Sequence, residues 1–93
     1  MIEFTSSIKI AVACQSDDPD MLMDIIRSID SQTVQPNKKI VLANSFFIPE
    51  LGEDWSFTVS SVLATGNADF VILTEKPLDK NYIFNFHKTY GGL

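Results

Sequence analysis

The fold is decided by residues 8–45, which read IKIAVACQSDDPDMLMDIIRSIDSQTVQPNKKIVLANS. The apolar run from Ile8 to Cys14 predicts a buried strand, and residues 39–43 predict a second strand of the same kind. Between them, apolar residues recur at positions 22, 25, 26 and 29, which is the spacing of one helix face. This order of strand, helix and strand is typical of a parallel pair joined by a right-handed crossover.

The start of this helix is marked by acidic residues around a proline. Asp18 suits the N-cap, Pro19 the first helical position and Asp20 the first turn, where the helix dipole favours negative charge. Pro36 prevents the helix from continuing. Asp17, Asp18 and Asp20 could also suggest a cation site, but capping explains two of the three without a ligand. We therefore favour capping.

The second half of the chain predicts two more helices and one strand. After a loop over residues 45–53, residues 54–66 have the apolar spacing of a second amphipathic helix. Residues 70–73 predict the third and most apolar strand. A third helix is predicted to be capped by Asp79 and ended by Gly91–Gly92. The shared face of that helix is predicted to hold Tyr82, Ile83, Phe86 and Tyr90.

Three strands that alternate with three helices predict a single α/β domain over residues 1–93. We expect a three-layer sandwich around a small, mainly parallel sheet with the strand order 3-2-1, which is a Rossmann-like half. In such sheets ligands bind at the carboxyl ends of the strands. The strand ends are therefore where a functional site is expected.

Composition excludes several classes of protein. An apolar fraction of 45% with 20% charged residues is ordinary for a folded domain and argues against disorder. The net charge of −5 disfavours nucleic-acid binding, and its acids are too dispersed for a DNA mimic. No apolar run reaches the ~20 residues of a membrane span. A single cysteine fits a reducing compartment, so we expect a cytoplasmic location.

Particular residues of this unit are similar to those of a known family. Leu22, Ser28, Gln32-Thr33, Pro36 and Asn44-Ser45 stand in the order and setting found at the start of family 2 glycosyltransferases. The chain resembles the N-terminal half of these enzymes, whose GT-A fold binds a nucleotide-diphosphate sugar. Residues 64–73 look like the helix end and strand that lead to the family's metal motif, and Pro77-Leu78 and Tyr82 resemble the segment after that motif. The similarity covers about residues 8–90.

The resemblance implies a nucleotide site at the strand ends, where this chain departs from the family pattern. Residues 13–16 replace Pro-x-Tyr-Asn, Ala43 replaces the Asp that reads the nucleobase, and Thr74-Glu75-Lys76 replace the metal-binding Asp-x-Asp. We predict no catalytic residue and no metal, although Glu75 could hold Mg²⁺ or Mn²⁺ weakly and Lys76 could neutralise a phosphate. The nucleotide-binding residues implied by the resemblance are Cys14, Gln15, Ser16, Asn44, Ser45, Thr74, Glu75 and Lys76.

Two hypotheses of function arise from this comparison. The first is a degenerate glycosyltransferase-like module that is not an enzyme and acts by binding a protein partner or forming a homo-oligomer. Its interface is expected around residues 46–48 and the third helix. The alternative is a module that binds a nucleotide sugar and acts as a glycosyltransferase, either without a metal or completed by another chain.

Three other features are open to a chemical and a structural interpretation, and we favour the structural one each time. Cys14 could accept a phosphoryl group, but we expect a buried thiol. His87 has no partner that spacing identifies, and we expect it at the surface. Four aromatic residues could form a stacking platform for a base or sugar, but we expect them to cover the end of the sheet. They are Trp55, Phe46, Phe47 and Phe57.

Overall fold

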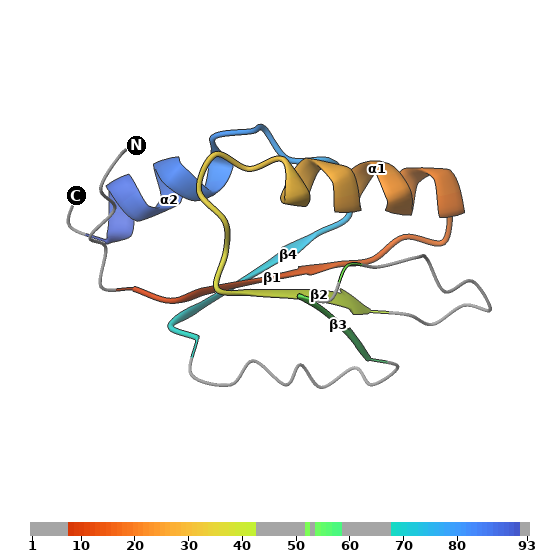
Figure 1. Ribbon diagram of the computed structural model, residues 1–93, viewed down its shortest axis with the longest axis horizontal. Coiled ribbons are helices and arrows are strands. Elements are labelled where there is room, and N and C mark those ends of the chain that lie inside the picture. The colour runs from red at the N-terminus through yellow and green to blue at the C-terminus, as the bar shows by residue number, and fades with distance from the viewer. Residues whose placement is uncertain (1–7, 43–51, 53, 59–67, 92–93) are drawn as a thin grey trace.

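The protein forms a four-stranded, all-parallel sheet with two helices (Figure 1). The structure, a computed structural model, describes residues 8–42, 52, 54–58 and 68–91. The predicted α/β class and the parallel sheet are confirmed. The elements in chain order are β1 (Ile10–Cys14), α1 (Pro19–Asp30), β2 (Lys38–Leu42), β3 (Trp55–Thr58), β4 (Phe70–Thr74) and α2 (Tyr82–Tyr90).

The order of the strands is β3-β2-β1-β4, which corrects the predicted 3-2-1. The third predicted strand, now β4, pairs with β1 instead of β2, with Ile10 opposite Phe70 and Cys14 opposite Thr74. The place beside β2 belongs to β3. This order places β1 between two neighbours, which agrees with the burial of all five of its residues, because a central strand exposes less surface than an edge strand.

The predicted helix at residues 54–66 is wrong where it can be checked, since Trp55–Thr58 is a strand. The rest of that prediction, over residues 59–66, lies outside the described residues, as does most of the loop predicted over residues 45–53. The sequence Trp-Ser-Phe-Thr also alternates with period two and is rich in strand-favouring residues, and this competing signal decides its structure.

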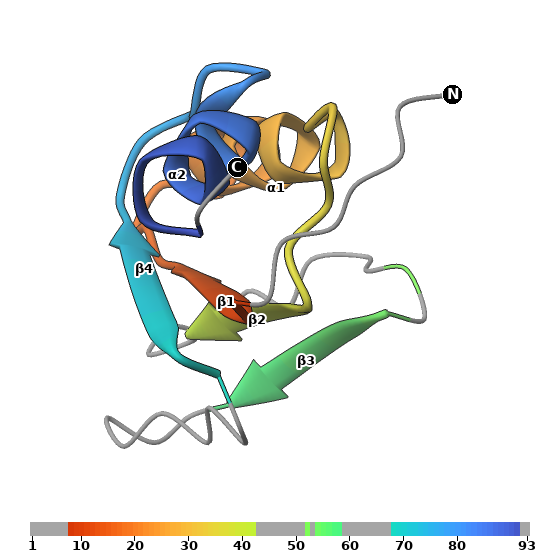
Figure 2. The same ribbon diagram turned by 90° about the vertical axis from the view of Figure 1, so that its left-hand side faces the viewer.

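Both described helices lie on the same side of the sheet, as the two ribbon views agree (Figures 1 and 2). The described residues therefore form two layers, and the third layer of the predicted sandwich does not appear among them. The core lies between these layers. Its buried residues are Ile10, Val12, Cys14, Leu22, Ile25, Ile26, Ile29, Val41, Trp55, Ile72 and Ile83.

Helix α1 begins as its sequence predicts. The side chain of Asp18 accepts hydrogen bonds from the backbone N–H groups of Asp20 at 3.0 Å and Met21 at 3.4 Å, and Pro19 occupies the first helical turn. Leu22, Ile25, Ile26 and Ile29 are all buried against the sheet. Capping and the apolar face of this helix are thus confirmed.

Helix α2 differs from its prediction in its cap and in its buried face. Its N-cap is Asn81, whereas Asp79 lies before the helix and accepts a hydrogen bond from the N–H of Asn81. The predicted end at Gly91 is confirmed. The expected surface position of His87 is wrong: it is only 2% exposed, because it lies one turn after Ile83 on the face that packs inward. Burial lowers the pKa of His87.

Candidate functional site at the carboxyl ends of β1 and β4

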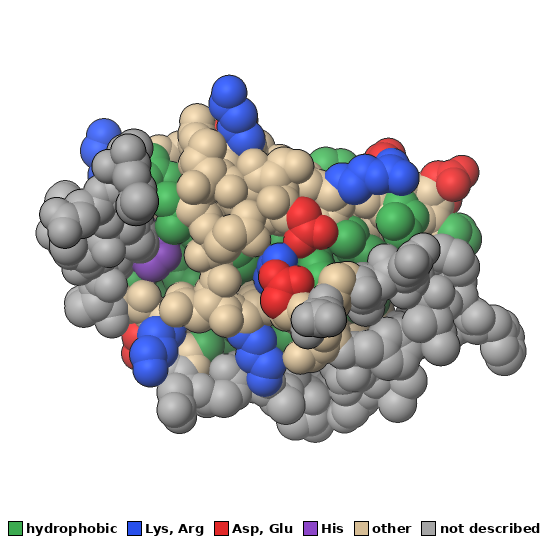
Figure 3. Space-filling view, in the orientation of Figure 1, with side chains coloured by type: hydrophobic (Ala, Val, Ile, Leu, Met, Phe, Trp, Pro, Cys, Tyr) green, Lys and Arg blue, Asp and Glu red, His purple; other side chains and the backbone are tan. Residues whose placement is uncertain are grey.

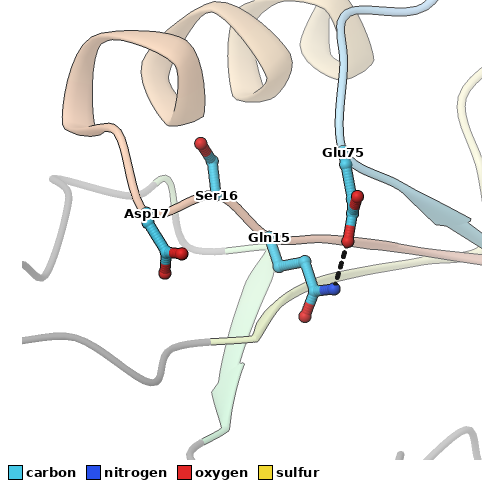
Figure 4. A pocket seen from close by; sticks show the side chains of 4 residues that line it. All are labelled: Gln15, Ser16, Asp17 and Glu75. Atoms are coloured by element: carbon cyan, nitrogen blue, oxygen red, sulfur yellow. Dashed lines mark hydrogen bonds between the residues drawn. The ribbon is translucent and has the colours of Figure 1, made fainter.

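A pocket of about 250 Å³ lies beyond the carboxyl ends of β1 and β4. Gln15, Ser16, Asp17 and Glu75 line it (Figure 4). The amide nitrogen of Gln15 donates to a carboxylate oxygen of Glu75 at 2.7 Å, so the two strand ends are joined through side chains as well as backbone. The backbone N–H of Gln15 also donates to the Thr74 carbonyl, at 3.2 Å.

The other side of the pocket belongs to the start of α1. The Ser16 hydroxyl oxygen accepts a hydrogen bond from the N–H of Asp18 at 3.1 Å, one residue before the helix begins. In Figure 4 the Asp17 carboxylate stands apart from the Gln15–Glu75 pair. Asp17 also lines the pocket, although the sequence suggested it only for a cation site at the helix start and not among the nucleotide-binding residues. Its position three residues after the strand was the available signal, which the acidic helix start beside it obscured.

Of the segment Thr74-Glu75-Lys76, only Glu75 lines this pocket. Thr74 is 6% exposed, and its hydroxyl donates to the Lys76 carbonyl at 2.6 Å. Glu75 lines the pocket with Gln15, whereas Lys76 lines an adjoining shallow hollow together with Leu73, Thr74 and Glu75. The Thr74 hydroxyl therefore stabilises the turn after β4, and only Glu75 lines the pocket.

The structure thus brings five of the eight predicted site residues to one rim of the sheet: Gln15, Ser16, Thr74, Glu75 and Lys76. Cys14 is fully buried beneath them. Asn44 and Ser45 lie outside the described residues, and so do Phe46 and Phe47. The described residues contain no group of three His, Cys, Asp or Glu side chains that could hold a metal ion.

Cys14 is a core residue with a suppressed thiol. Burial raises its pKa to about 12, and the negative charge of Asp30 acts in the same direction. Since the thiolate is the nucleophile, this environment disfavours the phosphoryl-transfer interpretation.

We accordingly expect Cys14 to react with a small thiol reagent at pH 8 at least ~100-fold more slowly in the folded chain than in urea. The measurement is the rate of alkylation followed by mass. Equal rates in the two states would show that the thiol is accessible and reactive.

The Gln-Thr-x-x-Pro segment on which the family resemblance rests serves as a structural junction. Gln32 is 5% exposed, and its amide nitrogen donates to the carbonyls of Asp79 at 2.6 Å and Ser28 at 3.0 Å. Its carbonyl oxygen accepts from the N–H of Ile83 at 3.0 Å. One side chain therefore joins the end of α1 to the first turn of α2.

Two neighbours of Gln32 extend this junction. The Thr33 hydroxyl donates to the side-chain oxygen of Asn81 at 2.8 Å. The Gln35 amide nitrogen lies within 3.2 Å of three carbonyls at and just after the end of α1, those of Ile29, Asp30 and Gln32. The polar residues of this motif are explained by hydrogen bonds within the protein, most of them to backbone groups, without any ligand.

A second feature that the sequence did not indicate is a charge cluster around Lys39 in β2. Lys39 is 5% exposed, and its ammonium contacts Asp30 at 2.8 Å, Asp54, and the ring of Trp55 at 5.4 Å from the centroid. Trp55 also donates its indole N–H to Asp30 at 2.9 Å, so it is a buried part of the sheet and not a stacking platform. The cluster fastens β3 to β2 and α1.

Charge of one sign does not gather on the face shown in Figure 3, where basic and acidic side chains are interspersed among the described residues. No helix in the described parts of the chain has the length and apolarity needed to cross a membrane. No protein-family model, curated protein or solved structure matches this chain. The likeness to family 2 glycosyltransferases therefore rests on particular residues of the sequence and remains a resemblance.

Proposed function

We propose that this chain is a degenerate glycosyltransferase-like module that acts by binding or assembly rather than by catalysis. The observation that supports this is the end of β4. Thr74 uses its hydroxyl on the Lys76 backbone, and the Glu75 carboxylate accepts from the Gln15 amide. The segment offers one engaged carboxylate where the family has two that hold Mg²⁺ or Mn²⁺ against a diphosphate.

The chemistry of the pocket favours an uncharged ligand with hydroxyl groups. Gln15, Ser16, Asp17 and Glu75 supply donors and acceptors of hydrogen bonds, which suit the hydroxyls of a sugar. The carboxylates of Asp17 and Glu75 make the electrostatic potential of the pocket more negative. This repels a diphosphate that is not accompanied by a cation. A nucleotide diphosphate without a cation is thus a poor ligand for this pocket.

Calorimetric titration tests the proposal. UDP, GDP and their sugars are titrated into the protein with and without Mn²⁺, and we expect no dissociation constant below about 1 mM in either case. The matched variant Glu75→Gln keeps the shape of the side chain and an acceptor for Gln15 but removes its charge, so it should bind the nucleotides no less well. Micromolar binding that requires Mn²⁺, or release of sugar from the donor, would contradict the proposal.

A second candidate is a metal-independent or partner-completed nucleotide-sugar site, and the position of Lys76 favours it. Lys76 lines the hollow that adjoins the pocket, where its ammonium could neutralise a phosphate. In that case the titration without metal shows binding that Lys76→Ala weakens by at least ~10-fold and that salt weakens further. The control is Lys80→Ala, an exposed lysine in the loop before α2.

A further inference from the structure

Strand β4 is an edge strand with an unprotected edge. In the part of the chain that the structure describes, it pairs with β1 on one side and has no neighbour on the other, and Figure 2 shows it at the margin of the sheet. Its sequence, Phe-Val-Ile-Leu-Thr, contains no charge, proline or glycine. Soluble proteins normally protect an exposed edge strand with charged residues or proline, because the unpaired backbone there is a template for another strand.

The direction of the free backbone groups follows from two hydrogen bonds. The N–H of Phe70 donates to the carbonyl of Lys9, just before β1, and the carbonyl of Thr74 accepts from the N–H of Gln15, just after it, both at 3.2 Å. Successive residues of a strand turn their N–H and C=O groups to opposite edges. The backbone groups of Phe70, Ile72 and Thr74 therefore point toward β1. Val71 and Leu73 present two N–H and two C=O groups to the open edge.

The side chains at the same two positions are unusually exposed for their type. Val71 is 40% exposed and Leu73 is 53% exposed, while Ile72 and Thr74 between and beside them are buried on the helix side. Hydrophobic side chains and free backbone groups thus coincide at this edge. Together they form a strip that another strand can cover.

We propose that β4 pairs with β4 of a second copy of this chain, antiparallel and about a two-fold axis through Ile72, so that the two sheets become continuous. In this register Val71 lies opposite Leu73 of the second copy. Both residues present their N–H and C=O outward, so each such pair exchanges two hydrogen bonds. The two-fold axis generates a second, equivalent pair, in which Leu73 lies opposite Val71 of the second copy. The strand is therefore complementary to itself.

Between two copies of this strand, charge favours the antiparallel direction over an in-register parallel one, in which Asp69 and Glu75 would each lie beside the same acidic residue of the second copy. Asp69 precedes β4, and Glu75 and Lys76 follow it. Antiparallel pairing brings Asp69 of one copy within one position of Lys76 of the other, at both ends of the strand. The same ends also bring Asp69 opposite Glu75. One lysine at each end therefore offsets only one of two acidic charges, and a weak repulsion remains. Moderate salt should therefore favour the pairing slightly.

This inference rests on the proposed binding or assembly function and names the partner. The two can fail separately, because the titration with nucleotides reports on the pocket, whereas sedimentation and amide exchange report on β4.

Sedimentation equilibrium of the full chain tests the pairing. We expect dimers at about 100 μM protein, since pairing through one short strand gives a small interface. Leu73→Lys should raise the dimer dissociation constant by about 100-fold, because it sets a charge on the edge. Met21→Lys is the matched control, since Met21 is 38% exposed on α1, and it should change nothing. A wild-type monomer at every concentration, or a dimer that Leu73→Lys leaves intact, would overturn the proposal.

Amide hydrogen exchange tests the register without a substitution. We expect protection of the Val71 and Leu73 amides to rise with protein concentration, while that of Phe70, which bonds to Lys9 within one copy, stays constant. Protection of Val71 and Leu73 that is independent of concentration would mean that another segment of the same chain covers the edge. That result, like an absence of protection at all concentrations, refutes pairing between copies.

Discussion

Replacing Gln32 with leucine is expected to lower the free energy of unfolding by about 3 kcal/mol, because several buried backbone groups lose a hydrogen-bond partner at once. The amide of Gln32 serves the carbonyls of Ser28 and Asp79 and the N–H of Ile83. Leucine fills the space but leaves these backbone groups without that partner. Urea unfolding followed by far-ultraviolet circular dichroism measures the change.

The control for Gln32 is Gln15→Leu. Gln15 makes its side-chain hydrogen bond with Glu75 at an exposed site, where water replaces the lost partner, so the loss should stay within about 0.5 kcal/mol. Equal losses in the two variants would show that the junction between α1 and α2 contributes nothing beyond an ordinary surface hydrogen bond. The idea that Gln32 is retained for structure would then have no support.

Replacing Lys39 with alanine is expected to cost about 3 kcal/mol near neutral pH, because it removes a buried apolar stem and a cation shared by Asp30 and Asp54. Lys39→Met keeps the stem and removes the charge, and we expect a loss of only about 1 kcal/mol, since both carboxylates remain in contact with water. Lys9→Ala, at an exposed position before β1, is the control and should change little.

The pH dependence separates the charge from the packing. Burial alone lowers the pKa of Lys39, but hydrogen bonds and charge from Asp30 and Asp54 outweigh it, and the pKa is raised above 10.5. The stabilisation is therefore complete below pH 10.5 and is lost as the pH rises through the folded pKa. The hydrogen bond from Lys39 lowers the pKa of Asp54 below 3.8, so that contribution is present above pH 3.8 and is lost in acid.

Unfolding measured across these limits should show the wild-type chain losing stability at both ends, with the difference from Lys39→Met shrinking there. A constant difference at all pH values would show that the cluster acts through packing alone. The same cluster holds Trp55, so its loss should also expose the indole, which fluorescence reports.

The functional proposals depend on different parts of the molecule. The pocket at the rim belongs to β1, β4 and the start of α1, whereas the proposed contact between copies uses the outer edge of β4. Leu73 does not line the pocket, but it lines the adjoining hollow together with Glu75, so ligand binding and assembly are separated by their measurements and not by single substitutions alone.

The sequence by itself determined most of the local elements and the parallel sheet. Strand β1 and helix α1 were predictable because their signals are local: an unbroken apolar run, a capping aspartate before a proline, and apolar residues at helical spacing. The rim residues Gln15 and Glu75 were predictable as well, since parallel strands end on one edge of a sheet.

Only the tertiary structure decided the order of the strands and the roles of Lys39, Gln32 and His87. Pairing of β4 with β1 joins Ile10 to Phe70, far apart in the chain, and no local pattern encodes such a contact. Lys39 lies in the interior because two carboxylates pair with its charge. Gln32 lies there because backbone groups up to 51 residues away bond to its amide, although both residues look solvent-exposed in the sequence. The physical reason is that a buried polar group is tolerated only when partners reach it, and the fold alone supplies those partners.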